Sequence, residues 1–111
     1  MPWIISYYSE RVLTDIRSLP ATLKARYAKL AGIITESGPN IGEPHTKAFG
    51  SGLFELRLKG KEGAARVMFC ALIEQQVVML HCFIKKTQKT PKHELDIAMR
   101  RLKEVKRDAD T

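Results

Sequence analysis

The sequence predicts a single two-layer α+β domain, in which a mainly antiparallel sheet packs on a helical hairpin in the order β-α-α-β-β-β-α. Three observations support this. Residues 53–59 alternate between apolar and charged side chains, the period of a half-buried strand. Residues 64–73 and 77–84 are rich in β-branched and large apolar residues, as further strands would be. Two earlier segments carry apolar residues at helical spacing, and 111 residues suffice for one hydrophobic core.

The amino-terminal half supplies the first strand and the helical hairpin. The aromatic and β-branched run at residues 1–8 predicts the strand, and Ser9 can cap the helix that follows. Pro20 suits the first turn of a second helix that ends at Gly38-Pro39. The apolar stripes of the two helices are Val12, Leu13, Ile16 and Leu19, then Leu23, Tyr27, Leu30 and Ile34.

The segment from residue 38 to 52 is predicted to be a loop, and we interpret His45 and Lys47 as solvated residues within it, although either could reach a ligand. Gly60 to Gly63 form a tight turn, and Glu74-Gln75-Gln76 separate the last two strands. A final helix begins near Thr90-Pro91. Its apolar stripe is Leu95, Ala98, Met99, Leu102 and Val105.

The two turns predict a register for the three central strands. A first turn centred on Lys61-Glu62 places Arg57 opposite Arg66, and a second turn centred on Gln75-Gln76 places Arg66 opposite Lys85. We call Arg57, Arg66 and Lys85 the cation row. The neighbouring row is Glu55, Met68 and Phe83. The same register puts the following residues on the opposite, core face: Phe54, Leu56, Leu58, Val67, Phe69, Leu80, Cys82 and Ile84.

Like charges directly opposite one another on a sheet cost stability, so the cation row needs an explanation. The long side chains either splay into solvent or bind an anion, and a phosphate group is the anion that this arrangement favours. His81 lies on the same face and could act as an acid or base, or pack as a partly buried polar residue against Cys70 and Leu53.

Charge and cysteine content restrict the class of protein. The formal net charge is +7, and 13 of the 19 basic residues lie after residue 50, which favours a polyanionic partner and nucleic acid above all. The basic face of the last helix is either solvated or in contact with nucleic acid or an acidic partner.

The sequence shows no signal peptide and no membrane-spanning run, so we expect a cytoplasmic protein that does not engage membranes. The register places Cys70 and Cys82 on opposite faces, and the histidines form no ligand pattern with them; we expect no disulfide, metal or cofactor.

Several segments resemble HigB-type toxins, the phage-protein-like branch of the RelE/ParE toxin superfamily. The resemblance rests on LFELR at residues 53–57, on Arg66-Val67, and on LHCFIKKTQKTP at residues 80–91 leading into Glu94 and Arg100-Arg101. It extends to the aromatic opening strand, the two helices and the GPN-I-G-EP loop, and so covers essentially the whole chain.

The resemblance implies a RelE/ParE-like fold and a bacterial type II toxin that enters the ribosomal A site and cleaves messenger RNA there. It also implies a co-encoded HigA-type antitoxin with a helix-turn-helix DNA-binding domain. The positions that match the toxins' functional residues are Arg57, Arg66, Phe83, Lys85 and Lys86. We predict further RNA contacts at Lys59, Lys61, Phe83, Lys89, Arg100 and Arg101.

Metal-free RNA cleavage uses the ribose 2′-hydroxyl as its nucleophile. Arg57 and Arg66 suit the phosphoryl oxygens, because a planar guanidinium grips two oxygens and stays charged. Lys85 or Lys86 is the candidate proton-transfer group, since neighbouring cations lower the pKa of a lysine. Glu55 and His81 are alternative candidates for the general base, and Phe83 could stack on an unpaired base or pack in the core. The competing functions are ParE-like inhibition of DNA gyrase and non-catalytic RNA binding.

Overall fold

The computed structural model describes residues 2–109 and confirms the α+β class. Its elements follow in the order β1 (Ile4–Tyr7), α1 (Glu10–Arg17), α2 (Ala21–Ser37), β2 (Thr46–Gly50), β3 (Leu53–Gly60), β4 (Gly63–Leu72), β5 (Gln76–Lys85) and α3 (Lys92–Ala109). The strands form one five-stranded sheet in the order β1-β5-β4-β3-β2. β1 pairs with β5 in parallel and the other neighbours are antiparallel, so the sheet is mixed.

Local signals explain where the first two helices begin. The Ser9 hydroxyl accepts a hydrogen bond of 3.3 Å from the backbone N–H of Val12 at the start of α1, as the sequence predicted. Pro20 precedes α2 as its cap residue rather than lying in its first turn, and it offers no side-chain cap. The carboxylate of Glu62, from the β3–β4 turn, accepts a hydrogen bond from the N–H of Thr22 instead, at 3.2 Å.

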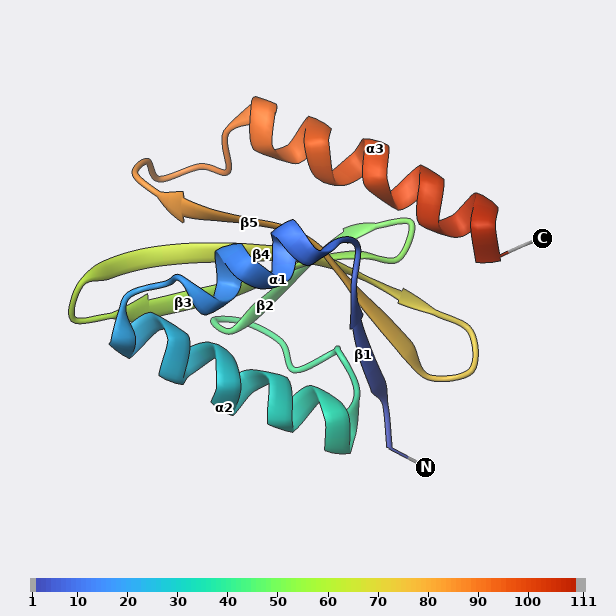
Figure 1. Ribbon diagram of the computed structural model, residues 1–111, viewed down its shortest axis with the longest axis horizontal. Helices are drawn as coiled ribbons and strands as arrows, with labels where there is room; N and C mark the ends of the chain where they lie inside the picture. Colours follow the sequence, from blue (N-terminus) through green and yellow to red (C-terminus); the bar gives the residue numbers. More distant parts are fainter. Residues whose placement is uncertain (1, 110–111) are drawn as a thin grey trace.

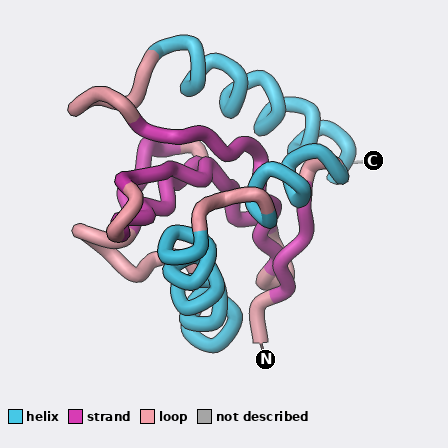
Figure 2. The backbone as a smooth tube through the Cα atoms, turned by 60° about the vertical axis from the view of Figure 1, so that its left-hand side comes forward, coloured by secondary structure: helices cyan, strands magenta, loops and turns pink. Residues whose placement is uncertain are grey.

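Helices cover both faces of the sheet, whereas the sequence predicted two layers. Figures 1 and 2 show the strands lying between α3 on one side and α2 on the other. One core cluster joins α1 and α2 to the sheet through residues that include Ile16, Leu30, Leu56 and Phe69. A second cluster lies under α3: Leu53, Met68, Cys70, Val78, Leu80, Phe83, Ala98 and Leu102. The second cluster forms because β4 and β5 carry apolar residues on both faces.

The segment predicted as a loop contains an edge strand. Residues of β2 pair antiparallel with β3, from Thr46 opposite Leu56 to Gly50 opposite Leu53, with a register shift between Ala48 and Gly50. The pairing places Lys47 directly opposite Glu55. The strand was missed because five residues that include a bulge and a terminal glycine show no regular alternation.

The predicted register is confirmed for one hairpin and wrong for the other. Arg57 lies opposite Arg66, as predicted. Arg66, however, faces Phe83, and Lys85 faces Ala64. The turn between β4 and β5 spans residues 73–75, and the register shifts again between Met68 and Phe69. At Arg66 the observed pairing therefore differs from the predicted one by two residues. As a result Lys85 is not level with Arg57 and Arg66, and the cation row is staggered.

The same bulge changes which residues face α3. Leu80 belongs to the cluster under α3 instead of the opposite core, and Met68 pairs with His81 rather than Phe83. Ile84 remains 47% exposed. Cys70 and Cys82 lie in different clusters as unpaired thiols, and burial raises the pKa of both, that of Cys82 to about 12.

Gly60 lets β3 approach α2, and we expect Gly60→Ala to lower the free energy of unfolding by about 1–3 kcal/mol. A Cβ at this position would stand 2.4 Å from Thr22 Oγ1 and 3.1 Å from Leu23 Cδ2. The Thr22 hydroxyl cannot turn away freely, because it accepts from the N–H of Lys61 at 3.1 Å and donates to Glu62.

Urea denaturation measures this effect, and Gly32→Ala is the matched control. Gly32 lies within α2, and apart from its chain neighbours and the nearby backbone of the helix no atom lies within 4 Å of the position that a Cβ would take. An alanine there should therefore stabilise the helix by about 1 kcal/mol. Equal stability of the Gly60→Ala protein and wild type would contradict the close approach.

Candidate functional site: a basic cleft over β3, β4 and β5

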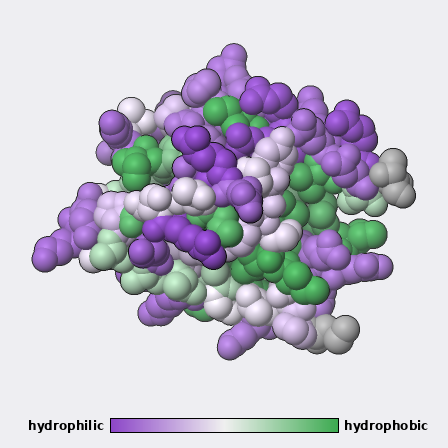
Figure 3. Space-filling view, in the orientation of Figure 1, coloured by the Kyte–Doolittle hydropathy of each residue, from purple (hydrophilic) through white to green (hydrophobic). Residues whose placement is uncertain are grey.

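A cleft of about 770 Å³ lies at the end of the sheet where β5 leaves it. We call it the basic cleft. Its lining comes from α2, the segment before β2, three strands and the segment after β5: Arg26, Pro44, His45, Arg57, Lys59, Ala64, Arg66, Lys85, Lys86, Thr87 and Gln88. All three members of the cation row therefore face one cavity, despite the stagger of Lys85. Figure 3 shows hydrophilic side chains along α3 at the top and at the far left end of the molecule, with hydrophobic ones gathered around β1.

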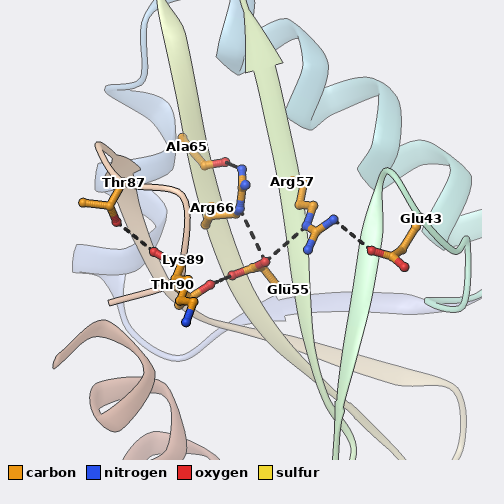
Figure 4. A network of polar contacts seen from close by, with 8 residues as sticks. All are labelled: Glu43, Glu55, Arg57, Ala65, Arg66, Thr87, Lys89 and Thr90. Carbon is orange, nitrogen blue, oxygen red and sulfur yellow. Dashed lines mark hydrogen bonds and ion pairs between the residues drawn. The ribbon is translucent and has the colours of Figure 1, made fainter. Parts of the chain in front are cut away.

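Glu55 holds the two arginines of the cation row together. Its side chain is 2% exposed, and its Oε1 lies 3.3 Å from Arg57 Nε and 3.4 Å from Arg66 Nε. Its Oε2 accepts a hydrogen bond from the hydroxyl of Thr90. Figure 4 shows the carboxylate between the two guanidinium groups, with Thr90 beside it. One buried carboxylate thus offsets the repulsion that the register imposes on Arg57 and Arg66.

Each arginine has a further contact. Arg57 Nη1 donates to Glu43 Oε1 at 3.1 Å, from the segment before β2. Arg66 Nη1 donates to the backbone oxygen of Ala65 at 3.3 Å. The buried Nε of Arg66 is within ion-pair range of Glu55 but donates no hydrogen bond to any residue between 2 and 109. The arginine side chains are 26% and 13% exposed, so they are fixed in place yet still accessible from the cleft.

The electrostatics of the cleft favour a bound anion. Burial lowers the pKa of Arg66, and the charge of Arg57 adds to this effect while Glu55 opposes it. Burial also lowers the pKa of Lys85, and the charges of Arg66, Arg57 and Lys47 outnumber the opposing charge of Glu55. Burial is the main cause of both pKa shifts, and repulsion between neighbouring cations adds to it; an anionic ligand would relieve that repulsion.

A smaller hollow of about 310 Å³ adjoins the cleft, and Arg57, Arg66, Lys85 and Gln88 line both. Its remaining lining residues are Lys47, Phe49, Glu55, Lys89, Thr90 and Leu95. The segment after β5 contributes lining residues to both spaces, and within it the Thr87 hydroxyl donates a hydrogen bond of 2.8 Å to the backbone oxygen of Lys89.

The structure brings most of the predicted site residues together. Lys59 and Lys86 line the basic cleft beside the cation row, and Lys89 lines the smaller hollow. Lys61 is exposed in the β3–β4 turn, and Arg100 is exposed on α3, and neither lines these two spaces.

Two of the predicted RNA contacts, Phe83 and Arg101, have structural contacts instead. Phe83 is 8% exposed, belongs to the cluster under α3 and stacks on His81, so its ring is not presented to an unpaired base. Arg101 donates to the backbone oxygen of Leu80 at 2.7 Å and lies 4.7 Å from the centroid of the Tyr8 ring. Both differences from the prediction have the same cause. The sheet face that carries Phe83 was expected to be exposed to solvent, and α3 covers it.

His81 lies outside the cleft and the smaller hollow, as a partly buried polar residue. Its Nε2 is 2.7 Å from Glu94 Oε1, which ties β5 to the first turn of α3. The structure thus separates this candidate base from the cation row.

Glu55, the other candidate base, is next to the cation row. Both of its carboxylate oxygens have partners and it is almost fully buried, an arrangement suited to orienting arginines.

The cleft and the smaller hollow also contain residues that the sequence analysis did not assign to a site. His45 lines the cleft, and its backbone oxygen accepts a 2.8 Å hydrogen bond from the N–H of Arg57. Arg26 reaches the cleft from α2, and Thr90 fixes Glu55. The sequence favours solvated loop positions for His45 and Lys47, because it carries no signal for edge strand β2. His45 lies just before this strand and lines the cleft, and Lys47 lies within it and lines the smaller hollow. In the sequence, nothing except its positive charge indicates that Arg26 lines the cleft.

The five-stranded mixed sheet and its helices form a RelE-like α+β fold. A chain of the crystal structure of the archaeal RelE–RelB complex from Pyrococcus horikoshii OT3 has a similar fold, with a TM-score of 0.55 and 15% sequence identity over 76% of this chain and 96% of that chain. The chain belongs to the family of phage-derived Gp49-like proteins (DUF891), whose model matches residues 14–103. No match is found among curated proteins. None of the helices within residues 2–109 has the length and hydrophobicity of a membrane span.

Proposed function

We propose that this protein is the toxin of a HigB-type type II toxin–antitoxin system and that it cleaves messenger RNA in the ribosomal A site. The observation that carries the proposal is the basic cleft, in which Arg57, Arg66 and Lys85 converge without enough acidic partners. The RelE-like fold supports it. A HigA-type helix-turn-helix antitoxin is the partner that we propose, and the similar archaeal structure is itself that of a RelE–RelB complex.

The proposed reaction needs no metal. The ribose 2′-oxygen attacks the adjacent phosphorus, the bond to the 5′-oxygen breaks, and the products carry a 2′,3′-cyclic phosphate and a 5′-hydroxyl. Arg57 and Arg66 stabilise the charge that develops on the phosphoryl oxygens, because Glu55 holds their guanidinium groups in place beforehand. Lys85 takes the proton of the 2′-hydroxyl, and Lys86, which also lines the cleft, is the alternative. The departing 5′-oxygen takes a proton from water and becomes the 5′-hydroxyl.

Induced expression in a bacterium tests the proposal, with primer extension on a reporter messenger RNA. We expect growth arrest and breaks within the translated region that disappear when translation is blocked. Arrest with halted DNA synthesis and intact messenger RNA would instead identify a ParE-like inhibitor of DNA gyrase. A folded protein that causes neither arrest nor breaks would leave RNA binding without catalysis as the function of the cleft.

The lowered pKa of Lys85 predicts a pH dependence of cleavage. Only the neutral amine can accept a proton, so the single-turnover rate should rise with pH, by about tenfold per unit, and level off below the range of an ordinary lysine. Cleavage of messenger RNA on purified ribosomes between about pH 6 and 9 measures this.

Lys85→Arg is the matched variant, because it keeps the positive charge but does not titrate in this range. We expect it to lose both the rate and the rising limb of the pH profile. A Lys85→Arg protein whose rate still rises with pH would place the base elsewhere, with Lys86 next in line.

A further inference from the structure

A second basic depression lies beside the cleft, between α2 and the end of β3. This α2–β3 groove has a volume of about 310 Å³ and is lined by Thr22, Ala25, Arg26, Lys29, Lys59 and Gly60. Arg26 and Lys59 line the basic cleft as well, so the two concave surfaces share a border. A linear ligand bound in the cleft can therefore continue into the groove without leaving the surface.

The groove contains cations without counter-charges. Arg26 and Lys29 are three residues apart on α2 and so lie on one face of the helix, opposite Lys59 of β3. None of the three side chains forms an ion pair with a residue in the described range 2–109, in contrast to Arg57, which has both Glu43 and Glu55. The nearby Glu62 is committed to the start of α2, through Thr22.

The chemistry of the lining selects the kind of contact. Apart from its cations, the groove offers the small residues Thr22, Ala25 and Gly60, and it has no aromatic side chain on which a base could stack. Such a surface can bind a phosphodiester backbone closely, and it offers no ring on which a base could stack. We propose that the α2–β3 groove binds the phosphodiester backbone of the RNA strand that occupies the cleft, at least one phosphate away from the cleaved bond. This inference rests on the proposed function, since the cleft itself must hold RNA.

Binding of uncleavable RNA tests the groove separately from catalysis. The probes are 2′-O-methyl oligonucleotides of two and of eight residues, and affinity is measured by fluorescence anisotropy across a series of salt concentrations. Each lost phosphate contact reduces the slope of log affinity against log salt by about 0.7 for a single strand. We expect Lys29→Ala to reduce the slope by this amount for the longer probe and to leave binding of the dinucleotide unchanged.

Lys24→Ala is the matched control, because Lys24 is exposed on the same helix but lines neither the groove nor the cleft. Equal slopes for wild type and Lys29→Ala would overturn the groove assignment, as would equal losses for Lys29→Ala and Lys24→Ala. Loss of ribosome affinity in Lys29→Ala without any change for the longer probe would assign the groove to ribosomal RNA and overturn the strand path. Failure of wild type to bind either probe would count against the RNA-binding cleft itself, and so against the proposed function.

Discussion

Arg66→Ala is expected to abolish growth arrest and to lower the rate of messenger RNA cleavage by roughly 10²–10³-fold, the effect of removing one preorganised donor to a developing oxyanion. Arg66 is placed for this role from three sides. Its backbone is fixed opposite Arg57, its Nε lies 3.4 Å from the buried Glu55, and its side chain lines the cleft. Single-turnover cleavage on ribosomes gives the rate, and induced expression gives the growth phenotype.

The fold of the Arg66→Ala protein should remain intact, because Glu55 keeps Arg57 as a partner and the repulsion between the two arginines is removed. Thermal unfolding checks this.

Arg66→Lys should recover only part of the rate, since a lysine restores the charge but cannot grip two oxygens. Arg57→Ala and Lys85→Ala should resemble Arg66→Ala, and Arg107→Ala, at an exposed position near the end of α3, should be mild. Full toxicity of a folded Arg66→Ala protein would refute the role of the cation row.

Local information in the sequence explains which part of the sheet could be predicted. The pairing of Arg57 with Arg66 depends on a tight turn between Gly60 and Gly63, which glycine makes recognisable. The next turn adopts positive φ at Glu74 and Gln75, residues that rarely signal this conformation. This turn and the bulge beside Phe69 shift Lys85 by two residues along β4, so that it lies opposite Ala64. A shift of two residues keeps a side chain on the same face, so Lys85 still lines the cleft with Arg57 and Arg66.

Tertiary packing determined the rest of the site. The burial of Phe83 and the contacts of Arg101 depend on α3 docking over β5, which hydrophobic periodicity alone does not specify. The same applies to Thr90, whose hydroxyl reaches a carboxylate 35 residues earlier in the chain. The sequence identified Glu55 as the one acidic residue near the cation row, but only the burial of its side chain indicates that it positions arginines.

Glu55→Ala is expected to lower the free energy of unfolding by about 3 kcal/mol, the lower end of the range for removing one partner of a buried ion pair. The lower end applies because Arg57 keeps Glu43 as a partner and is partly exposed. Cleavage should also fall, since neither guanidinium would be held in place. Glu55→Gln keeps the volume and the contact with Thr90, and should lose less stability. Urea denaturation of both proteins gives the free energies of unfolding.

A double-mutant cycle separates this role from general packing at Glu55. In a protein that already lacks Arg66, only one buried cation loses its partner when Glu55 is removed, so Glu55→Ala should cost about 1–2 kcal/mol less there than in wild type. Additive losses in the double variant would mean that Glu55 stabilises the fold independently of the arginines.

If Glu55 were the general base, a different pattern would be expected: Glu55→Gln would abolish cleavage with no loss of stability. Positioning predicts that stability and cleavage fall together, because the same carboxylate that offsets the repulsion between Arg57 and Arg66 also orients them toward the cleft.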